Sequence, residues 1–104
     1  MVAKDIPAGY GPDDDIEDEG PDPVWLQLAA ILQARIRRGD YSPRRVIPSI
    51  DQMVQEFGVA RGTVRKSVGL LAELGMVRVV SGKGTFVAEQ PGDAAEDTPG
   101  EQQP

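Results

Sequence analysis

Arg61 and Arg65 stand four residues apart in a stretch that also holds Gly62, Thr63 and Lys66. On a helix, side chains four residues apart project from the same face. A guanidinium can donate two hydrogen bonds to O6 and N7 of guanine, which contribute about 1–3 kcal/mol of discrimination against other bases. Thr63 and Lys66 can contact phosphate oxygens, and Gly62 permits a close approach to a phosphate. This stretch has the chemistry of a nucleic-acid-binding surface.

A solvated helix face is the alternative explanation for these charges, because most charged helix surfaces bind no ligand. Lys83 has the same alternative, since a Lys is ordinary at the tip of a hairpin. We interpret Arg35, Arg37 and Arg38 as partners of a helix dipole rather than as DNA ligands, because they fall in the last turns of a predicted helix.

Basic residues are concentrated in the middle of the chain, which has 104 residues and a net charge of −6. Residues 23–88 hold ten Lys or Arg against four Asp or Glu, residues 1–22 hold eight acids and one Lys, and residues 89–104 hold five acids and no base. The length and pattern predict one domain, 23–88, between two disordered acidic tails, 1–22 and 89–104. We expect these tails either to compete with DNA for the basic surface or only to confer solubility.

A first helix is predicted between Asp22, as N-cap, and Gly39, as the glycine that follows it, with Pro23 in the first helical position. Its apolar stripe at three- and four-residue spacing comprises Trp25, Leu28, Ala29, Leu32 and Ile36.

Two more helices and a hairpin are predicted after a short extended piece at Val46-Ile47. Ser49 and Gln52 have the spacing of a capping box at the start of the second helix, which Gly58 ends. The third helix runs from about Arg61 to Leu74 and is capped by Gly75. Its N-terminal turns carry the basic stretch on the side opposite the apolar face.

The last two elements are β-rich runs, Val77–Val80 and Thr85–Val87, around the tip Ser81-Gly82-Lys83-Gly84. The order predicts a mainly α fold with a small β-hairpin, a winged helix-turn-helix of three helices and a two- or three-stranded wing. Proteins of this plan insert the N-terminal residues of the second motif helix into the major groove of DNA. Lys83 at the tip can then reach a phosphate or a narrow groove.

Residues 24–88 resemble the N-terminal domain of the GntR family of bacterial regulators. The matching stretches are Ile36-Arg37-Arg38-Gly39-Asp40-Tyr41, Ile47-Pro48-Ser49, Phe57-Gly58-Val59-Ala60-Arg61-Gly62-Thr63-Val64-Arg65, Leu70-Leu71-Ala72-Glu73-Leu74-Gly75-Met76-Val77 and Ser81-Gly82-Lys83-Gly84-Thr85-Phe86-Val87. The resemblance implies that Arg61 and Arg65 contact operator DNA, and that the wing tip, Gly82 and Lys83, enters the minor groove. Ser49, in the Pro-Ser pair, is also taken as a DNA contact.

The sequence departs from the family pattern at several positions. The acid and the DNA-holding Arg that usually follow the Pro-Ser pair are Ile50 and Asp51 here, so one contact is lost or moved. The usual Ser or Thr N-cap of the recognition helix is Ala60, which costs about 1 kcal/mol. Arg44 replaces a usual Gly, and Arg44 and Arg45 are expected to supply compensating phosphate contacts. Family members usually continue into a large effector domain; this chain stops, so ligand sensing is not expected.

Catalysis is not expected, nor is any metal or cofactor. The chain has no His and no Cys, which excludes the common zinc, catalytic-triad and thiol chemistries. The glycine-rich Ser81–Thr85 stretch lacks the spacing of a phosphate-binding loop. No apolar run is long enough for a membrane span, and the acidic N-terminus is unlike a signal peptide, so we expect a cytoplasmic, nucleoid-associated protein without a membrane partner.

The sequence therefore predicts a sequence-specific, DNA-binding transcription regulator of a bacterium, a repressor that binds an inverted-repeat operator in double-stranded DNA. We expect a monomer or weak homodimer in the absence of DNA. The alternative is a winged-helix module for protein–protein interaction, or an antagonist of a larger regulator, which would more often carry apolar residues in place of the basic face.

Overall fold

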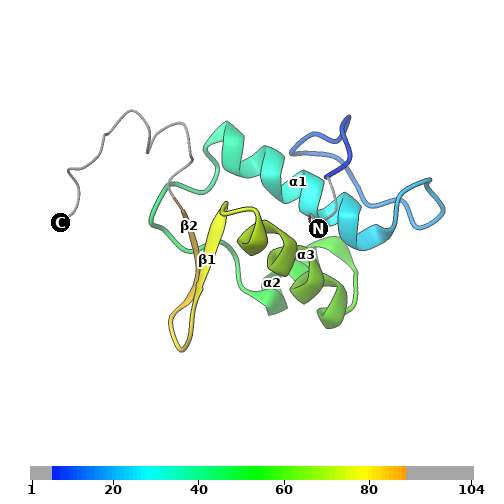
Figure 1. Cartoon of the computed structure of the whole chain (residues 1–104). Helices are drawn as coiled ribbons and strands as arrows, with labels where there is room; N and C mark the ends of the chain where they lie inside the picture. The colour runs from blue at the N-terminus through cyan, green and yellow to red at the C-terminus, as the bar shows by residue number, and fades with distance from the viewer. Residues whose placement is uncertain (1–5, 89–104) are drawn as a thin grey trace.

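The computed structural model describes residues 6–88 of the chain. Three helices precede a two-stranded antiparallel hairpin in this part (Figure 1): α1 (Val24–Arg38), α2 (Ile50–Phe57), α3 (Arg61–Glu73), β1 (Val77–Val80) and β2 (Gly84–Val87). The predicted order of three helices and a hairpin wing is confirmed. The stretch 89–104, predicted to be a disordered acidic tail, lies outside the described residues, as do residues 1–5.

The second helix begins and ends as its local sequence predicts. The Ser49 hydroxyl accepts a hydrogen bond from the Gln52 amide at 3.1 Å, and the Gln52 side chain accepts one from the Ser49 amide at 2.8 Å. Gly58 ends α2 in the left-handed conformation, with φ of 68°. These bonds satisfy backbone groups that the first turn of a helix leaves unpaired, which fixes the start of α2.

The predicted N-cap of the first helix is wrong. Pro23 itself occupies the N-cap position of α1, with no side-chain cap, and its carbonyl accepts bonds from the amides of Leu26 and Gln27. The Asp22 carboxylate instead accepts a hydrogen bond of 2.7 Å from the Tyr10 hydroxyl. The Asp22 carboxylate, which was expected to cap the amides at the start of α1, thus binds Tyr10 of the N-terminal segment instead.

The chain before α2 runs beside the wing. Val46 forms a single antiparallel bridge with Phe86. The backbone amide of Ile47 also donates to the carbonyl of Thr85 at 2.8 Å, and the amide of Arg44 donates to the carbonyl of Val87 at 2.8 Å. The wing therefore has two full strands and one short third edge, which ties the start of α2 to the hairpin.

The core lies where α1 crosses α3 and the base of the wing. Its fully buried members include Leu28 and Leu32 of α1, Met53 of α2, and Val64 and Leu71 of α3. The buried hydroxyl of Ser67 in α3 donates to the carbonyl of Trp25 at 2.7 Å, which adds a polar link between the two helices. This packing holds α3 at a set angle and leaves its opposite side exposed.

The N-terminal segment, here residues 6–22, differs from the predicted disordered tail because it follows a defined path along α1. The fully buried Gln27 side chain donates to the carbonyls of Glu17 at 2.9 Å and Asp22 at 2.7 Å, and it accepts from the Glu17 amide at 2.8 Å. Ile6 and Ile16 pack against the core. Composition predicted disorder because the acidic residues of the segment greatly outnumber Ile6 and Ile16, which anchor it. The side-chain amide that binds the segment belongs to Gln27, which lies in α1 and not in the segment itself.

Gln27→Ala is expected to release the N-terminal segment while the helices stay folded. It removes three hydrogen bonds, each of which contributes about 0.5–1.5 kcal/mol. Cleavage by a glutamate-specific protease after Glu17 should therefore accelerate about tenfold or more, as measured by mass spectrometry. Gln55→Ala is the matched control, because Gln55 is exposed on α2. Equal cleavage rates in the two variants would show that Gln27 does not hold the segment.

No helix among residues 6–88 combines the length and the apolar character that crossing a membrane requires.

Candidate nucleic-acid interface

The start of α3 presents two arginines to solvent. Arg61 is the first residue of α3 and Arg65 lies one turn later; both are exposed. Within residues 6–88, the Arg65 side chain has no hydrogen-bond or ion-pair partner, whereas Arg61 pairs with Asp51 of α2 at 2.5 Å. The structure thus places both arginines on the exposed side of α3, as the helical period predicts.

Gly62 lies between these arginines and has no structural need to be glycine. A Cβ atom at this position would meet no atom within 4 Å, and the residue has an ordinary helical φ. Glycine inside a helix costs about 1 kcal/mol relative to alanine. Despite this loss of helix stability, Gly62 leaves the backbone at the start of α3 without a side chain, so that a partner can approach it closely.

A hollow of about 370 Å³ separates the start of α2 and α3 from the wing. Five of the residues named from the sequence line it: Ser49 just before α2, Ile50 and Asp51 of α2, Arg61 of α3, and Lys83 of the wing tip. Lys83 is exposed and lies next to Gly82, whose φ of 79° shapes the tight tip. The fold therefore gathers two cations, from elements 22 residues apart, around one open hollow.

Arg44 and Arg45 are exposed on the chain that runs beside β2. Arg44 has φ of 67°, the one positive value at a non-glycine residue in the described part of the chain. Such a backbone favours glycine, which gives a physical reason for the glycine usual at this position in the resembling family. The backbone bonds of this turn to Val87 fix both side chains at the flank of the wing.

Lys66 and Thr63 are placed differently from the two arginines. The Lys66 ammonium lies 4.4 Å from the centre of the Trp25 ring, a cation–π contact that joins α3 to α1. Thr63 is half-buried, and its carbonyl accepts a bond from Ser67 at 3.0 Å. The spacing in the sequence groups Lys66 with Arg65. In the structure, however, the Lys66 side chain packs on the indole of Trp25 in α1, about 40 residues earlier in the chain.

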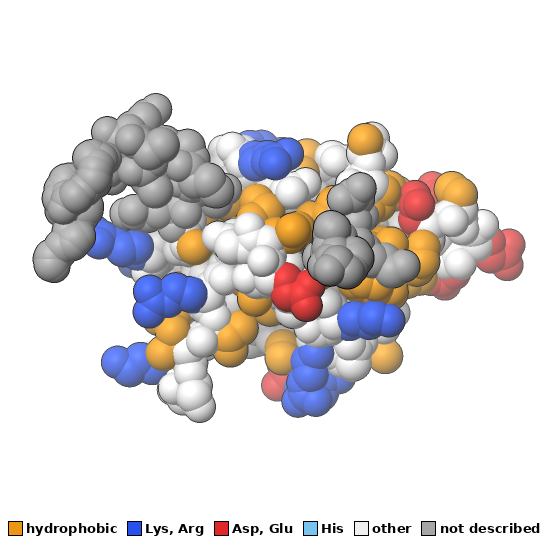
Figure 2. All heavy atoms as spheres, in the orientation of Figure 1, with side chains coloured by type: hydrophobic (Ala, Val, Ile, Leu, Met, Phe, Trp, Pro, Cys, Tyr) orange, Lys and Arg blue, Asp and Glu red, His pale blue; other side chains and the backbone are white. Residues whose placement is uncertain are grey.

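The surface charges divide the molecule into a basic side and an acidic end. Figure 2 shows Lys and Arg side chains along the hairpin and the lower edge formed by α2 and α3, as well as at the top, whereas a group of Asp and Glu side chains lies at the right-hand end. Cationic side chains grouped along one side of a protein favour binding to a polyanion.

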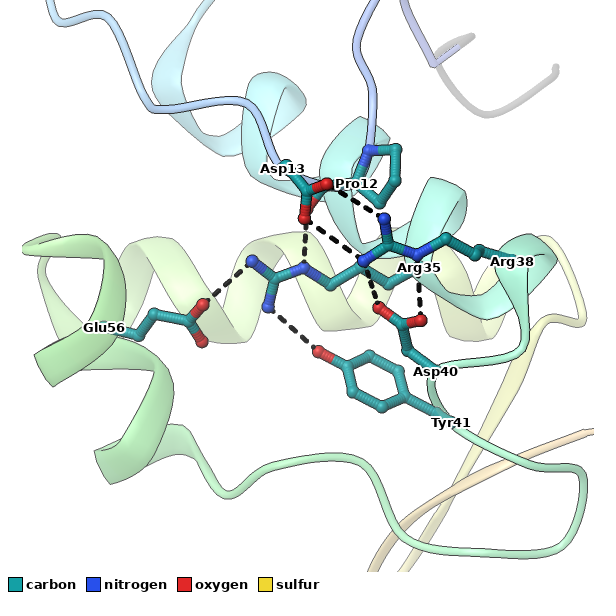
Figure 3. A network of polar contacts seen from close by, with 7 residues as sticks. All are labelled: Pro12, Asp13, Arg35, Arg38, Asp40, Tyr41 and Glu56. Carbon is teal, nitrogen blue, oxygen red and sulfur yellow. Dashed lines mark hydrogen bonds and ion pairs between the residues drawn. The ribbon is translucent and has the colours of Figure 1, made fainter.

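The arginines at the end of α1 do more than complement a helix dipole. Arg35 donates to the carbonyl of Pro12 at 2.9 Å and to the Tyr41 hydroxyl at 3.1 Å, and it pairs with Glu56 of α2 at 2.8 Å (Figure 3). Its guanidinium also lies 5.0 Å from the centre of the Phe57 ring. The hydrogen bond that Arg35 donates to the Glu56 carboxylate raises the pKa of Arg35, against the opposing effect of burial. Arg35 therefore ties together four parts of the chain, which no local pattern indicated.

Arg38 holds the acidic N-terminal segment beside the same helix end. It pairs with Asp13 at 2.9 Å and with Asp40 at 2.7 Å (Figure 3), and its hydrogen bonds hold the pKa of each carboxyl below its usual value. Within residues 6–88, no ion pair joins segment 6–22 to Arg61, Arg65 or Lys83. Within this segment Asp13 thus meets α1, and competition between the acidic tails and DNA for the basic face stays a prediction.

Comparison with known proteins gives a consistent picture. The model of the bacterial regulatory proteins of the gntR family matches residues 25–87. The chain is 41% identical over 64 residues to the uncharacterized HTH-type transcriptional regulator RB1450 of Rhizobium meliloti, covering 62% of this chain and 26% of that one. It is 31% identical over 74 residues to the HTH-type transcriptional repressor NagR of Bacillus subtilis, covering 71% and 30%. The chain thus spans less than a third of the length of these relatives.

Solved structures of the same shape include DNA complexes. The DNA-binding domain of AraR in complex with operator ORR3 has a TM-score of 0.64 and 34% identity, covering 73% of this chain and 92% of that one. YtrA from Sulfolobus acidocaldarius, a GntR-family transcription factor, has a TM-score of 0.66 and 28% identity, covering 73% and 80%. The three helices and hairpin form the winged helix-turn-helix of these domains.

Proposed function

Because this chain belongs to the GntR family of bacterial regulatory proteins, we propose that it binds an operator in double-stranded DNA and regulates transcription as a repressor. One observation carries the proposal: the start of α3 exposes Arg61 and Arg65, and Arg61 lies with Lys83 of the wing tip around a hollow that the protein leaves open. The names of relatives support it, since NagR is a repressor and the AraR domain is bound to operators.

In this proposal, α3 enters the major groove with its N-terminal turns. Arg61 and Arg65 donate to base edges, and the bare backbone at Gly62 allows the groove wall to come close. The wing tip, Gly82 and Lys83, reaches the minor groove or the adjacent backbone.

The remaining contacts go to phosphates and set the register on the duplex. Ser49 lies beside the hollow, Arg44 and Arg45 flank the wing, and Thr63 follows the bare backbone of α3. Lys66 reaches a phosphate only by leaving the Trp25 ring. A protein that acts in this way is held at the bacterial chromosome, in the nucleoid.

Binding to genomic fragments across a salt series tests this function. Counterion release lowers log K against log salt concentration by about 0.9 per neutralised phosphate, so phosphate contacts from Arg44, Arg45 and Lys83 predict a slope of about −3 or steeper. Selection of bound fragments should return one recurring sequence. Fragments that fail to bind even at low salt would contradict DNA binding and favour a protein–protein module.

We further propose that two copies occupy an inverted repeat, because helix-turn-helix dimers mirror the symmetry of their operators. Sedimentation of the free chain should show a monomer or a weak dimer, and the selected sequence should have two-fold symmetry. A tight dimer without DNA would contradict the first expectation, and an asymmetric site the second.

A further inference from the structure

Asp51 places a negative charge in the middle of the proposed DNA-binding surface. It lies in the first turn of α2, its side chain is 71% exposed, and it lines the hollow together with Arg61 and Lys83. Its carboxylate pairs with the Arg61 guanidinium at 2.5 Å. An anion at this place repels the phosphates that the surrounding cations attract.

Stability alone gives Asp51 a small role. Ion pairs between exposed side chains contribute little to the free energy of unfolding, and both partners here are more than half exposed. An acid in the first turn of a helix adds a modest favourable interaction with the helix dipole. Neither effect requires the acid to engage Arg61, the one recognition arginine within its reach.

The pair has two consequences for a guanidinium that must read a base. The carboxylate occupies one nitrogen of Arg61, which narrows the orientations of a long side chain, while the guanidinium keeps further donors for a two-bond contact. The same negative charge disfavours a phosphate in the hollow, so Arg61 is less free to bind DNA of any sequence through its backbone.

We propose that Asp51 is a positioning residue that sets specificity, by holding Arg61 for a base edge and keeping phosphate out of the hollow. This inference rests on the proposed DNA binding. It predicts that Asp51 lowers affinity for DNA in general and raises the ratio of operator binding to non-specific binding.

Asp51→Asn tests the proposal, because the amide has the size of the carboxylate without its charge. Affinity of the full chain for a random-sequence duplex should rise about three- to tenfold, and the ratio of operator to random-duplex affinity should fall by a similar factor. Asp51→Arg should raise the random-duplex affinity further and make the salt slope steeper by about 0.9, the value of one more phosphate contact.

Two controls separate this role from a general charge or folding effect. Glu73→Gln removes the same charge near the other end of α3, about 18 Å along the helix from Arg61, and should change both affinities less than twofold. In an Arg61→Ala background, Asp51→Asn should no longer change the specificity ratio, because the residue it positions is gone. Thermal unfolding of each variant checks that the fold is retained.

The outcomes distinguish the inference from the proposed function. If the wild-type chain selects an operator but Asp51→Asn changes neither affinity by more than twofold, the inference alone is overturned. It is also overturned if the specificity ratio falls equally in the Arg61→Ala background. If the wild-type chain binds no duplex at any salt concentration, the proposed function fails, and this inference fails with it.

Discussion

Replacing Arg61 and Arg65 together by alanine is expected to remove most discrimination between operator and random DNA. Each arginine that makes a two-bond contact with guanine contributes about 1–3 kcal/mol, so each single variant should bind the operator about 5- to 150-fold more weakly. The double variant should retain the non-specific binding that other cations supply. The measurement is a titration of each variant against the selected operator and a random duplex.

The fold should survive these substitutions. Both arginines are exposed at the start of α3, and alanine is the best helix former. Arg37→Ala is the matched control, because Arg37 is exposed in the last turn of α1 and lies outside the hollow. Operator affinity unchanged in both single variants would remove α3 from the interface, even if the protein still binds DNA through other residues.

Leu71→Ala is expected to have the largest effect on stability. Leu71 is fully buried where α3 packs against α1, and truncation of such a side chain costs about 2–5 kcal/mol through lost burial and the cavity left behind. A domain of this size has a total stability of about 5–15 kcal/mol, so the melting temperature should fall by about 10–30 °C.

Leu74→Ala makes the same chemical change three residues further along the chain. Leu74 is 40% exposed at the end of α3, so its truncation should cost less than about 1 kcal/mol. Calorimetry or circular dichroism of the two variants, measured side by side, tests which face of α3 is buried. Similar melting temperatures for both would contradict the packing of α3 and, with it, the orientation of Arg61 and Arg65.

Much of the fold could be predicted from the sequence because its signals act over a few residues. The Ser49–Gln52 capping box, the left-handed Gly58 and the hairpin tip each involve neighbours in the chain, so their geometry follows from local sterics and hydrogen bonding. The exposed pair of arginines follows in the same way from the helical period. The error at Asp22 shows where this reasoning ends, since Tyr10 competes for the capping carboxylate.

The sequence by itself thus determined the order of the elements, the boundaries of α2 and the exposed arginines of α3. Only the tertiary structure decided which partner each remaining charge takes. Lys66 meets Trp25, and Arg61 meets Asp51, because the packing of α1 and α2 against α3 brings these residues together. The N-terminal segment is held for the same reason, by Gln27 and by arginines at the end of α1. A charged side chain has many possible partners along a chain, and folding, which sets distances between remote residues, chooses among them.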